Sequence, residues 1–468
     1  PGRRDPQVRA RLCPGPRVDL ADRIHASTFC IMAKLVVVAL LPAALGLAPG
    51  LAPLARPALT PVRASAPLMA AIAPETAAAP SAAVDELPGF SGLHGKAMRV
   101  EAADVPSKAQ VKAAVPKHCF TRDTKKSLGY AAISVAQSLA CLAAGTLIPL
   151  KAAFLPLWVA YAAVAGTVWT GMWGVAHECG HAAFSDNKRL ETAVGYLLHT
   201  VLLVPYFSWQ HSHAVHHGHT NHITKGETHV PAVVGGRAGI ENTGGEAELA
   251  NARRFGKGPW GALQLVLHLV IGWPAYLLWG ATGGPKYGTS NHFVPARPFS
   301  SALWDVRKGW ASKVWQSDVG VVAMVAALAA LATKVGAASV LALYAGPLAV
   351  VNMWLVGYTW LQHTDVDIPH LSADEFSYMR GAFLTVDRPY GRIFDWFHHR
   401  IGSTHVAHHI DCTIPHYHAK EATDAIAAAF PKAYLYDPTP VHKALWRVAS
   451  NCIAVKPRAD GRYTWVPV

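Results

Sequence analysis

Long apolar segments dominate the chain beyond residue 127. Leu128–Leu150 and Ala152–Ala176 contain no charged residue, and only Lys151 separates them. A helix needs about 20 residues to cross the hydrocarbon core of a bilayer. Both segments are long enough, and Pro149 and Pro156 flank the lysine. The pattern therefore predicts a tight hairpin of two membrane-spanning helices.

Two later apolar segments predict a second hairpin. Val319–Thr333 and Ala337–Leu361 are joined around Lys334 and Gly336. The first of these is short, about 22 Å long at 1.5 Å per residue. We expect Lys313–Asp318 to extend it as a flank at the membrane interface.

Trp260–Gly283 is also apolar, but Gly272 and Pro274 interrupt it. Histidine groups near residues 177–217 and 405–409 can meet at one membrane face only if an even number of spans separates them. We therefore expect Trp260–Gly283 to lie at the interface or to re-enter, which leaves four spans.

The basic residues suggest which side of the membrane faces the cytosol. Lys117, Arg122, Lys125 and Lys126 precede the first span, whereas the following loop carries only Lys151. By the positive-inside bias, the N-terminal flank and the end of the second span face the cytosol or its equivalent.

The composition agrees with a membrane protein. Only 15% of the residues are charged, against about 25% in soluble proteins, and the mean hydropathy is +0.20. The net charge is +13, but no run of Lys and Arg lies beside stacking aromatics. A basic rim facing anionic lipid explains that charge better than nucleic acid does. The 7 cysteines form no CxxC pair, so neither a zinc ribbon nor a redox dithiol is supported.

The N-terminal part is not expected to belong to the fold. Residues 1–31 precede the first methionine, and we interpret them as a non-native or upstream-derived leader. Residues 32–84 begin with a cationic start and the apolar run Leu35–Leu47, followed by acid-poor Ala/Pro-rich sequence. This pattern is typical of a targeting segment, with a plastid address and the low-complexity N-terminus of an endoplasmic-reticulum enzyme equally supported.

The histidines are numerous and grouped. There are 25 of them, nearly as many as the 29 acidic residues. His177 and His181, in H-E-C-G-H after the second span, lie on one helix face if the helix continues. If these two histidines stood alone, we would interpret them as residues at the membrane interface. Zinc proteases also carry H-E-x-x-H, but they do not carry it at the end of a long apolar helix.

The other two groups share one spacing. H-x-x-H-H occurs in His213–His217 and again in His405–His409, beyond the second hairpin. Either group alone would fit a histidine-rich surface loop. Their repetition on one predicted membrane face, beside the H-E-C-G-H pair, instead favours a shared metal centre.

The donor set restricts the metal. Imidazole suits iron, copper and zinc, whereas Mg²⁺ and Ca²⁺ prefer oxygen ligands. Eight imidazoles are too many for a single ion and suit two. Two irons with open positions could activate dioxygen against an unactivated C–H bond of a substrate dissolved in the bilayer.

Several motifs carry a resemblance to a known family. They are H-E-C-G-H-A-A-F-S, V-P-Y-F-S-W, H-A-V-H-H, L-Q-H-T, T-V-D-R-P-Y-G and T-H-V-A-H-H…I-P-H-Y-H-A-K-E-A-T. With these motifs the chain resembles the membrane-bound fatty acid desaturases, and it is most similar to their plant and algal Δ12 (omega-6, oleate) branch. The resemblance covers residues 115–456.

The resemblance implies a fold and a domain organisation. The fold is an all-α integral membrane protein with four transmembrane helices in two hairpins and a cytosolic-side helical cap that holds a histidine-ligated di-iron centre. Residues 85–127 would form an N-terminal segment on the cytosolic side and 128–468 the desaturase domain, with spans at 128–150, 152–176, 319–333 and 337–361.

The resemblance also implies the ligands. They are His177, His181, His213, His216, His217, His405, His408 and His409, with His363 of L-Q-H-T as a ninth. No catalytic residue apart from these ligands is expected, and the substrate-binding residues are not predicted. Six other residues lie near the histidine groups in the sequence and could orient or supplement the ligands: Glu178, Thr359, Asp365, Asp411, His416 and His418.

Three departures from the family pattern stand out. Thr359 occupies a position where the acyl-CoA desaturase branch has an Asn that contacts iron through water, so that contact is in doubt. Ala182 replaces the last histidine of H-E-C-G-H-H, and Ala214 and Val215 replace the arginines of H-R-R-H-H. Neither of these last two changes removes a ligand, but losing two arginines is expected to alter contact with the electron donor or a lipid headgroup.

The function implied is an O₂-dependent acyl-lipid desaturase in the endoplasmic reticulum or plastid membrane. It would insert a cis double bond at Δ12 of oleate to give linoleate. The resemblance implies two iron ions, O₂ as co-substrate, and electrons from a separate cytochrome b5 or ferredoxin.

Alternatives remain within and outside this class. I-P-H-Y-H favours an omega-3 (Δ15) desaturase, whereas H-V-A-H-H and H-A-K-E-A-T favour Δ12; a related fatty acyl hydroxylase is also compatible. A histidine-rich zinc transporter or sensor would place charged or histidine residues within its spans. The spans here are nearly free of them.

Overall fold

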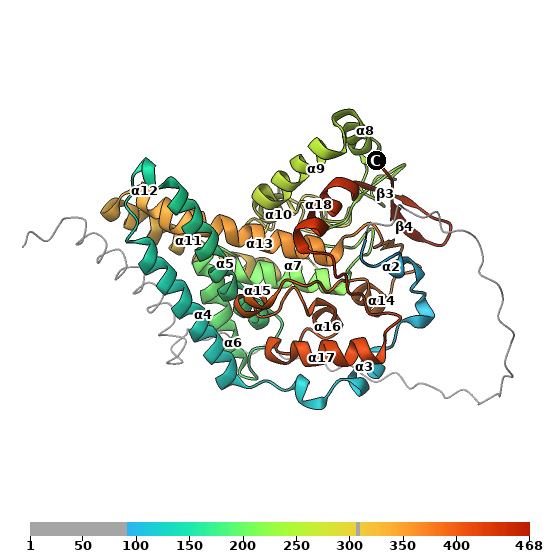
Figure 1. Ribbon diagram of the computed structural model, residues 1–468, viewed down its shortest axis with the longest axis horizontal. Coiled ribbons are helices and arrows are strands. Elements are labelled where there is room, and N and C mark those ends of the chain that lie inside the picture. Colours follow the sequence, from blue (N-terminus) through green and yellow to red (C-terminus); the bar gives the residue numbers. More distant parts are fainter. Residues whose placement is uncertain (1–90, 306–308) are drawn as a thin grey trace, which may run out of the picture.

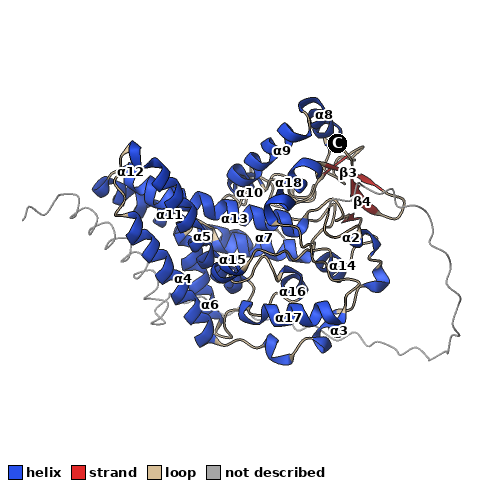
Figure 2. Ribbon diagram, in the orientation of Figure 1, coloured by secondary structure: helices blue, strands red, loops and turns tan. Residues whose placement is uncertain are grey.

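The computed structural model describes residues 91–305 and 309–468. The predicted leader (1–31) and targeting segment (32–84) lie outside the described residues. The described chain is mostly helical, with long helices on one side and a cap of short helices and a small sheet on the other (Figures 1 and 2).

The first predicted hairpin is present, with shifted bounds. Helix α4 spans Thr124–Gly145 and α5 spans Leu155–Gly180. The predicted bounds of the first span, 128–150, both lie further along the chain than the ends of α4. The Asp123 carboxylate accepts hydrogen bonds from the backbone N–H groups of Lys125 and Lys126, which caps an earlier first turn.

The second hairpin is longer than predicted. Helix α11 spans Trp310–Val335, so the expected flank Lys313–Asp318 is part of one continuous helix. Helix α12 (Ala337–Val340) continues through a π-helical segment, Leu341–Ala345, into α13 (Gly346–His363).

Helices α5 and α13 pack closely along each other. A Cβ atom on Gly166 of α5 would lie 2.4 Å from the carbonyl oxygen of Pro347 in α13. A glycine is therefore required where the two backbones approach. This contact brings the C-terminal ends of α5 and α13 to the same region of the molecule (Figure 1).

The segment between the hairpins adds further helices. Helices α6 (Lys188–Val201) and α7 (Tyr206–Gly218) meet at an angle of 104°. Helix α9 (Lys257–Val266) runs through a π-helical segment, Leu267–Ile271, into α10 (Gly272–Trp279).

More helices could cross a membrane than the four expected. By length and composition the described residues contain 5 such helices, or 6 if the bent α6–α7 pair counts as one span. The additional helix is Lys257–Trp279, which overlaps the segment Trp260–Gly283 that we expected at the interface.

The cap covers the ends of α5, α7 and α13. A hydrophobic core that includes Val111, Cys119, Ile410 and Ile426 holds its N-terminal and C-terminal parts together. The remaining helices are α2 (Lys96–Arg99), α3 (Lys108–Ala114), α8 (Gly245–Phe255), α14 (Tyr378–Phe383), α15 (Arg392–Phe397), α16 (His405–Ile410), α17 (His416–Ala429) and α18 (Val441–Asn451), with 3₁₀ turns at Ala102–Asp104, Lys117–Phe120 and Ala152–Phe154.

A small sheet of four short strands accompanies the helices. Its strand order is β1-β3-β4-β2, with β1 parallel to β3 and the other pairs antiparallel. The Asp460 side chain accepts a hydrogen bond from the Arg462 backbone, and Gly461 has a φ of 76°, so β3 and β4 form a hairpin around a left-handed glycine. The strands are β1 (Ala232–Val233), β2 (His370–Leu371), β3 (Ala454–Pro457) and β4 (Arg462–Trp465).

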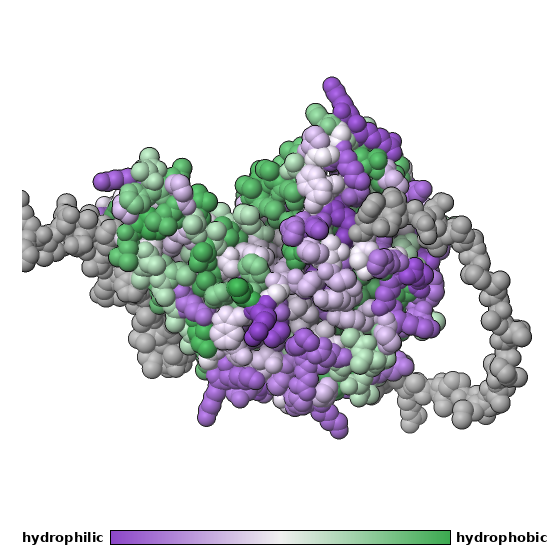
Figure 3. Space-filling view, viewed as in Figure 1, coloured by the Kyte–Doolittle hydropathy of each residue, from purple (hydrophilic) through white to green (hydrophobic). Residues whose placement is uncertain are grey.

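The surface divides in the same way as the fold. Hydrophobic residues gather over the long hairpin helices, whereas hydrophilic residues gather over the cap (Figure 3). Large side chains such as Val159, Val319 and Leu341 are exposed on the hairpins. Such a continuous apolar surface fits contact with lipid.

Candidate metal centre

Four helices bring the predicted ligands together. α5 ends at Gly180, so His177 lies in its last turn and His181 is the residue that caps it. Their ring centroids are 4.6 Å apart, as the i,i+4 spacing predicted. The second histidine group (His213–His217) lies on α7 and the third (His405–His409) on α16. His363 is the last residue of α13.

One set of close histidines contains residues from all three histidine groups. His177, His181, His213 and His408 each place a ring nitrogen within 4.8 Å of the others. The Nε2 atoms of His177 and His213 are 3.1 Å apart. Nitrogens this close around a common centre suit one metal ion.

A second set lies beside it, formed by His216, His363 and His409. The Nε2 atom of His363 is 3.1 Å from that of His216 and 3.0 Å from that of His405. The ring of His217 stacks on that of His409 with centroids 4.0 Å apart. All nine predicted ligands therefore lie in one cluster with two centres.

The imidazoles are suited to bind a metal. Burial lowers the pKa of His405, His408 and His409 well below the usual value, so these rings are neutral and have a free lone pair. Within the described chain, the buried Nε2 atoms of His181, His408 and His409 have no hydrogen-bond partner. Buried nitrogens without a partner are costly unless a metal takes them as ligands.

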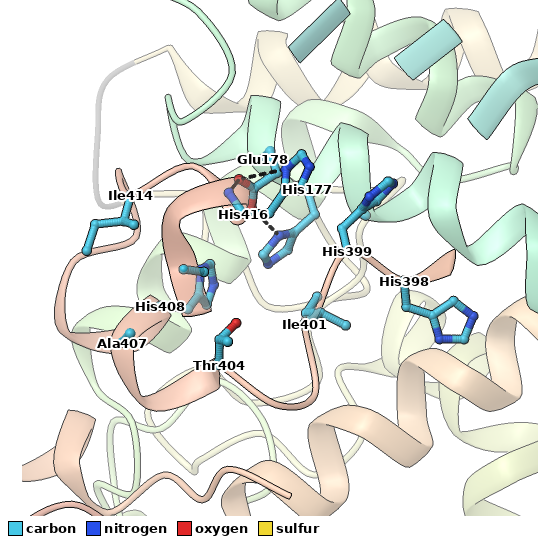
Figure 4. A pocket seen from close by; sticks show the side chains of 12 residues that line it. His177, Glu178, His398, His399, Ile401, Thr404, Ala407, His408, Ile414 and His416 are labelled. Carbon is cyan, nitrogen blue, oxygen red and sulfur yellow. Dashed lines mark hydrogen bonds and ion pairs between the residues drawn. The ribbon is translucent and has the colours of Figure 1, made fainter. Parts of the chain in front are cut away.

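Glu178 lies beside two histidines, as expected for a residue that orients a ligand. One carboxylate oxygen is 3.7 Å from Nδ1 of His177. The other accepts a 2.9 Å hydrogen bond from the backbone N–H of His416 (Figure 4). The negative charge next to His177 favours a proton on Nδ1 and leaves Nε2 for the metal.

Thr220 has a similar role that the sequence did not reveal. Its hydroxyl donates to the His216 carbonyl oxygen, so it accepts the 3.1 Å hydrogen bond from Nδ1 of His409. This arrangement fixes the proton on Nδ1 and directs Nε2 of His409 into the cluster. The only sequence signal for this role is that Thr220 follows His216 by four residues, a spacing that brings side chains close on a helix.

Asp365 does not contact a histidine in the way we expected. Its carboxylate accepts hydrogen bonds from Arg388, at 2.6 Å, and from Arg447, at 2.9 Å. Asp437 completes this buried group by pairing with both arginines. A fully buried carboxylate requires cationic partners, and the arginines meet that need.

The other predicted supporting residues differ in position. Asp411 is buried and pairs with two partly exposed lysines of the cap, Lys108 and Lys112, each at 3.5 Å. His418 packs against His118, with ring centroids 5.3 Å apart. The Thr359 hydroxyl donates to its own helix, so its expected role at the metal has no direct contact to support it.

An apolar pocket between α5 and α13 reaches the cluster. His177, His213 and His405 form its polar end. A second pocket, which shares His177 with the first, contains Glu178 and His416 (Figure 4). The rest of the apolar pocket is lined by Thr170, Trp173, Gly174, Leu355, Tyr358, Thr359, Gln362, His398 and Ile401.

Comparisons with known proteins agree with this arrangement. Residues 153–439, which include all nine clustered histidines, match the fatty acid desaturase family. The Delta(12)-fatty-acid desaturase FAD2 of Vernicia fordii is 39% identical over 355 residues, which cover 74% of this chain and 87% of that protein.

Two other relatives are similarly close. The omega-6 fatty acid desaturase, endoplasmic reticulum isozyme 2, of Glycine max is 39% identical over 355 residues, covering 75% of this chain and 88% of that protein. The Delta(12)-fatty-acid desaturase of Arabidopsis thaliana is 38% identical over 360 residues, covering 76% and 89%. These matches confirm the resemblance carried by the motifs: the chain belongs to the fatty acid desaturase family.

Proposed function

We propose that this protein is an O₂-dependent acyl-lipid desaturase that inserts a cis double bond at Δ12 of oleate to give linoleate. The observation that carries the proposal is the convergence of nine histidines at the end of an apolar pocket between two long helices. The relatives named as Delta(12) desaturases support the choice of position.

The cluster fits two iron ions. His177, His181, His213 and His408 would hold one ion, and His216, His363 and His409 the other, with His217 and His405 beside both. When bound, iron supplies the activation of dioxygen that removal of hydrogen from an unactivated C–H bond requires. A nitrogen-only donor set is compatible with iron and unsuited to Mg²⁺ or Ca²⁺.

The protein's own residues position the ligands and exclude water. The Glu178 carboxylate lies beside Nδ1 of His177, and the Thr220 hydroxyl accepts from Nδ1 of His409; both contacts favour rings that present Nε2 to a metal. The walls contributed by Trp173, Leu355 and Ile401 offer an acyl chain an apolar environment next to the ligands. An extended lipid chain bound there would have its methylene groups beside the metal centre.

The positions of the ligands support four membrane spans. His177 and His363 both lie at C-terminal helix ends and belong to the same cluster, so α5 and α13 run toward one membrane face. The chain between α5 and α11 must then cross the membrane an even number of times. Zero crossings is the simplest solution, with Lys257–Trp279 lying along the interface.

The sidedness and the name of one relative favour one electron donor and one compartment. Basic residues at the start of α4 favour the cytosol for the face that carries the cluster. The Glycine max relative is named as an endoplasmic reticulum isozyme. We therefore favour the endoplasmic reticulum with cytochrome b5 over a plastid with ferredoxin.

Expression of the full chain in a yeast whose lipids contain oleate and no linoleate tests the function. Gas chromatography of its fatty acids should show a Δ9,12 diene, and the His408→Ala variant should show none. A product seen only after linoleate feeding would indicate an omega-3 desaturase, and a hydroxylated oleate would indicate a hydroxylase. Unchanged oleate in cells that contain folded protein would overturn the proposal.

A further inference from the structure

A separate cluster of metal-binding side chains lies at the surface of the cap. His118 and Cys119 belong to the 3₁₀ turn Lys117–Phe120, which precedes α4, and His418 and Glu421 belong to α17. One ligand atom from each of the four lies within 4.8 Å of the others. The two segments are 303 residues apart at the His118–Glu421 contact, so only the folded chain forms this cluster.

The four side chains converge around His118. Its Nε2 atom is 2.8 Å from a carboxylate oxygen of Glu421 and 3.8 Å from the sulfur of Cys119. The ring of His418 meets that of His118 edge to face, with centroids 5.3 Å apart. Tetrahedral coordination at bond lengths of about 2.0–2.3 Å needs ligand atoms about 3.3–3.8 Å apart, so small side-chain shifts would suffice.

Burial and exposure are arranged as an accessible metal site requires. Cys119 is fully buried, so its sulfur is fixed by packing. The side chains of His118 and Glu421 are 54% and 50% exposed, which leaves an open path from solvent. An ion could enter from the aqueous side and close the contact between the two segments.

The charges of the cluster balance a divalent cation. A thiolate from Cys119 and the carboxylate of Glu421 supply two negative charges. Without a metal, burial and the nearby Glu421 raise the pKa of the Cys119 thiol to about 11, so an ion must displace the thiol proton on binding. Lys126 acts electrostatically on His418, and its positive charge opposes this binding.

We propose that His118, Cys119, His418 and Glu421 form a zinc site, distinct from the iron cluster, that joins the segment before α4 to α17. Two imidazoles, one thiolate and one carboxylate are ligands that zinc accepts in tetrahedral sites. Calcium and magnesium are excluded because they require mainly oxygen ligands.

The zinc site has a structural consequence for the iron cluster. The backbone of His416, in the first turn of α17, donates to Glu178, which lies beside the ligand His177. His418 is in the same turn, so zinc would hold this turn in place. This coupling rests on the proposed function, whereas zinc binding itself does not.

Cobalt substitution of the purified full chain tests the site. Cobalt bound to a thiolate gives an intense charge-transfer absorption in the near ultraviolet, and the proposed iron ligands contain no sulfur. We expect this absorption in the wild-type chain and its loss in Cys119→Ser. The matched control Cys141→Ser changes a half-buried cysteine of α4 and should keep the absorption.

Zinc content gives a second, independent readout. Removal of this site should lower bound zinc by roughly one ion per chain in Cys119→Ser and in Glu421→Gln, with bound iron unchanged. Glu421 is half exposed, so its substitution keeps the test valid if Cys119→Ser does not fold. Absence of the thiolate absorption in the wild type, or its survival in Cys119→Ser, would overturn the proposal.

The outcome is separable from that of the proposed function. Product formation in yeast depends on the iron cluster and is measured on the same variants. A wild-type chain that shows the cobalt–thiolate absorption but makes no linoleate would overturn only the proposed function. A chain that makes linoleate but lacks the absorption would overturn only the zinc site.

Discussion

Glu178 accepts a 2.9 Å hydrogen bond from the backbone N–H of His416, a residue 238 positions later in the chain. The same carboxylate lies 3.7 Å from the ring of His177. One side chain at the end of α5 therefore connects the first histidine box to the start of α17. This contact joins a long apolar helix to the cap that completes the metal cluster.

Glu178→Gln should reduce activity without removing the ligands. Gln keeps the size of the side chain but loses the negative charge beside His177, so the preference for a proton on Nδ1 weakens. We expect activity to fall by about 10–100-fold, as for other residues that orient metal ligands. Linoleate formed per folded chain measures this effect.

Glu248→Gln, on the exposed face of α8, is the control and should leave product formation unchanged. Full activity of Glu178→Gln would show that the carboxylate does not orient His177.

The buried group of Arg388, Arg447, Asp365 and Asp437 should be important for stability. Arg388 is fully buried and also donates to the Leu361 carbonyl oxygen near the end of α13. Arg388→Met leaves both carboxylates with one arginine, and we expect a loss of about 3–5 kcal/mol in unfolding free energy. Chemical denaturation in detergent measures it.

The surface pair of Arg458 and Asp460 provides the comparison. Arg458→Met removes a 3.7 Å ion pair between partly exposed side chains, and its expected cost is less than about 1 kcal/mol. Equal losses from the two variants would contradict the importance given to the buried group.

Much of this site could be predicted from local patterns. Histidine spacing placed His177 next to His181, and uninterrupted apolar length predicted both hairpins, because these signals lie within single segments. Residues whose partners are distant in the chain could not be assigned. Asp365 is two positions from His363, yet its partners Arg388 and Arg447 come from later segments.

The same reason explains other differences. Strand β1 has only two residues, which is too short for a pattern of alternating polar and apolar positions, and its partner β3 comes more than 200 residues later. The β3–β4 hairpin, by contrast, carried a readable turn at Asp460 and Gly461. The bounds of α4 and α11 differed because capping and polar first turns extend helices beyond their apolar segments.

Glu227 should make stability depend on pH. Burial raises the pKa of this carboxyl from 4.5 to about 8. The unfolded chain loses the proton near pH 4.5 but the folded chain keeps it until about pH 8, so the contribution of Glu227 to stability is lost as pH rises through this window. Glu227→Gln does not ionise, so its stability relative to wild type should increase over the same window.

Thermal unfolding at about pH 5 and about pH 8.5 measures this difference. The exposed Asp374→Asn variant is the control and should show the same change in unfolding temperature as wild type. A Glu227→Gln variant that tracks wild type at both pH values would contradict the prediction.

The apolar pocket should control access of the acyl chain. Leu355 is a buried pocket residue of α13, and Leu355→Trp would fill the space near His405. We expect product formation to fall at least about tenfold, which corresponds to about 1.4 kcal/mol, with bound iron retained. Leu341→Trp, on the exposed surface of the same span, should be neutral. Equal activity of both variants would exclude this pocket as the path.

The iron content of the purified full chain tests the central claim most directly. Two neighbouring histidine groups, one of four residues and one of three, predict about two iron ions per chain in active preparations. Bound iron should fall in the His216→Ala variant together with linoleate formation. An iron-free preparation that still converts oleate to linoleate would contradict the account.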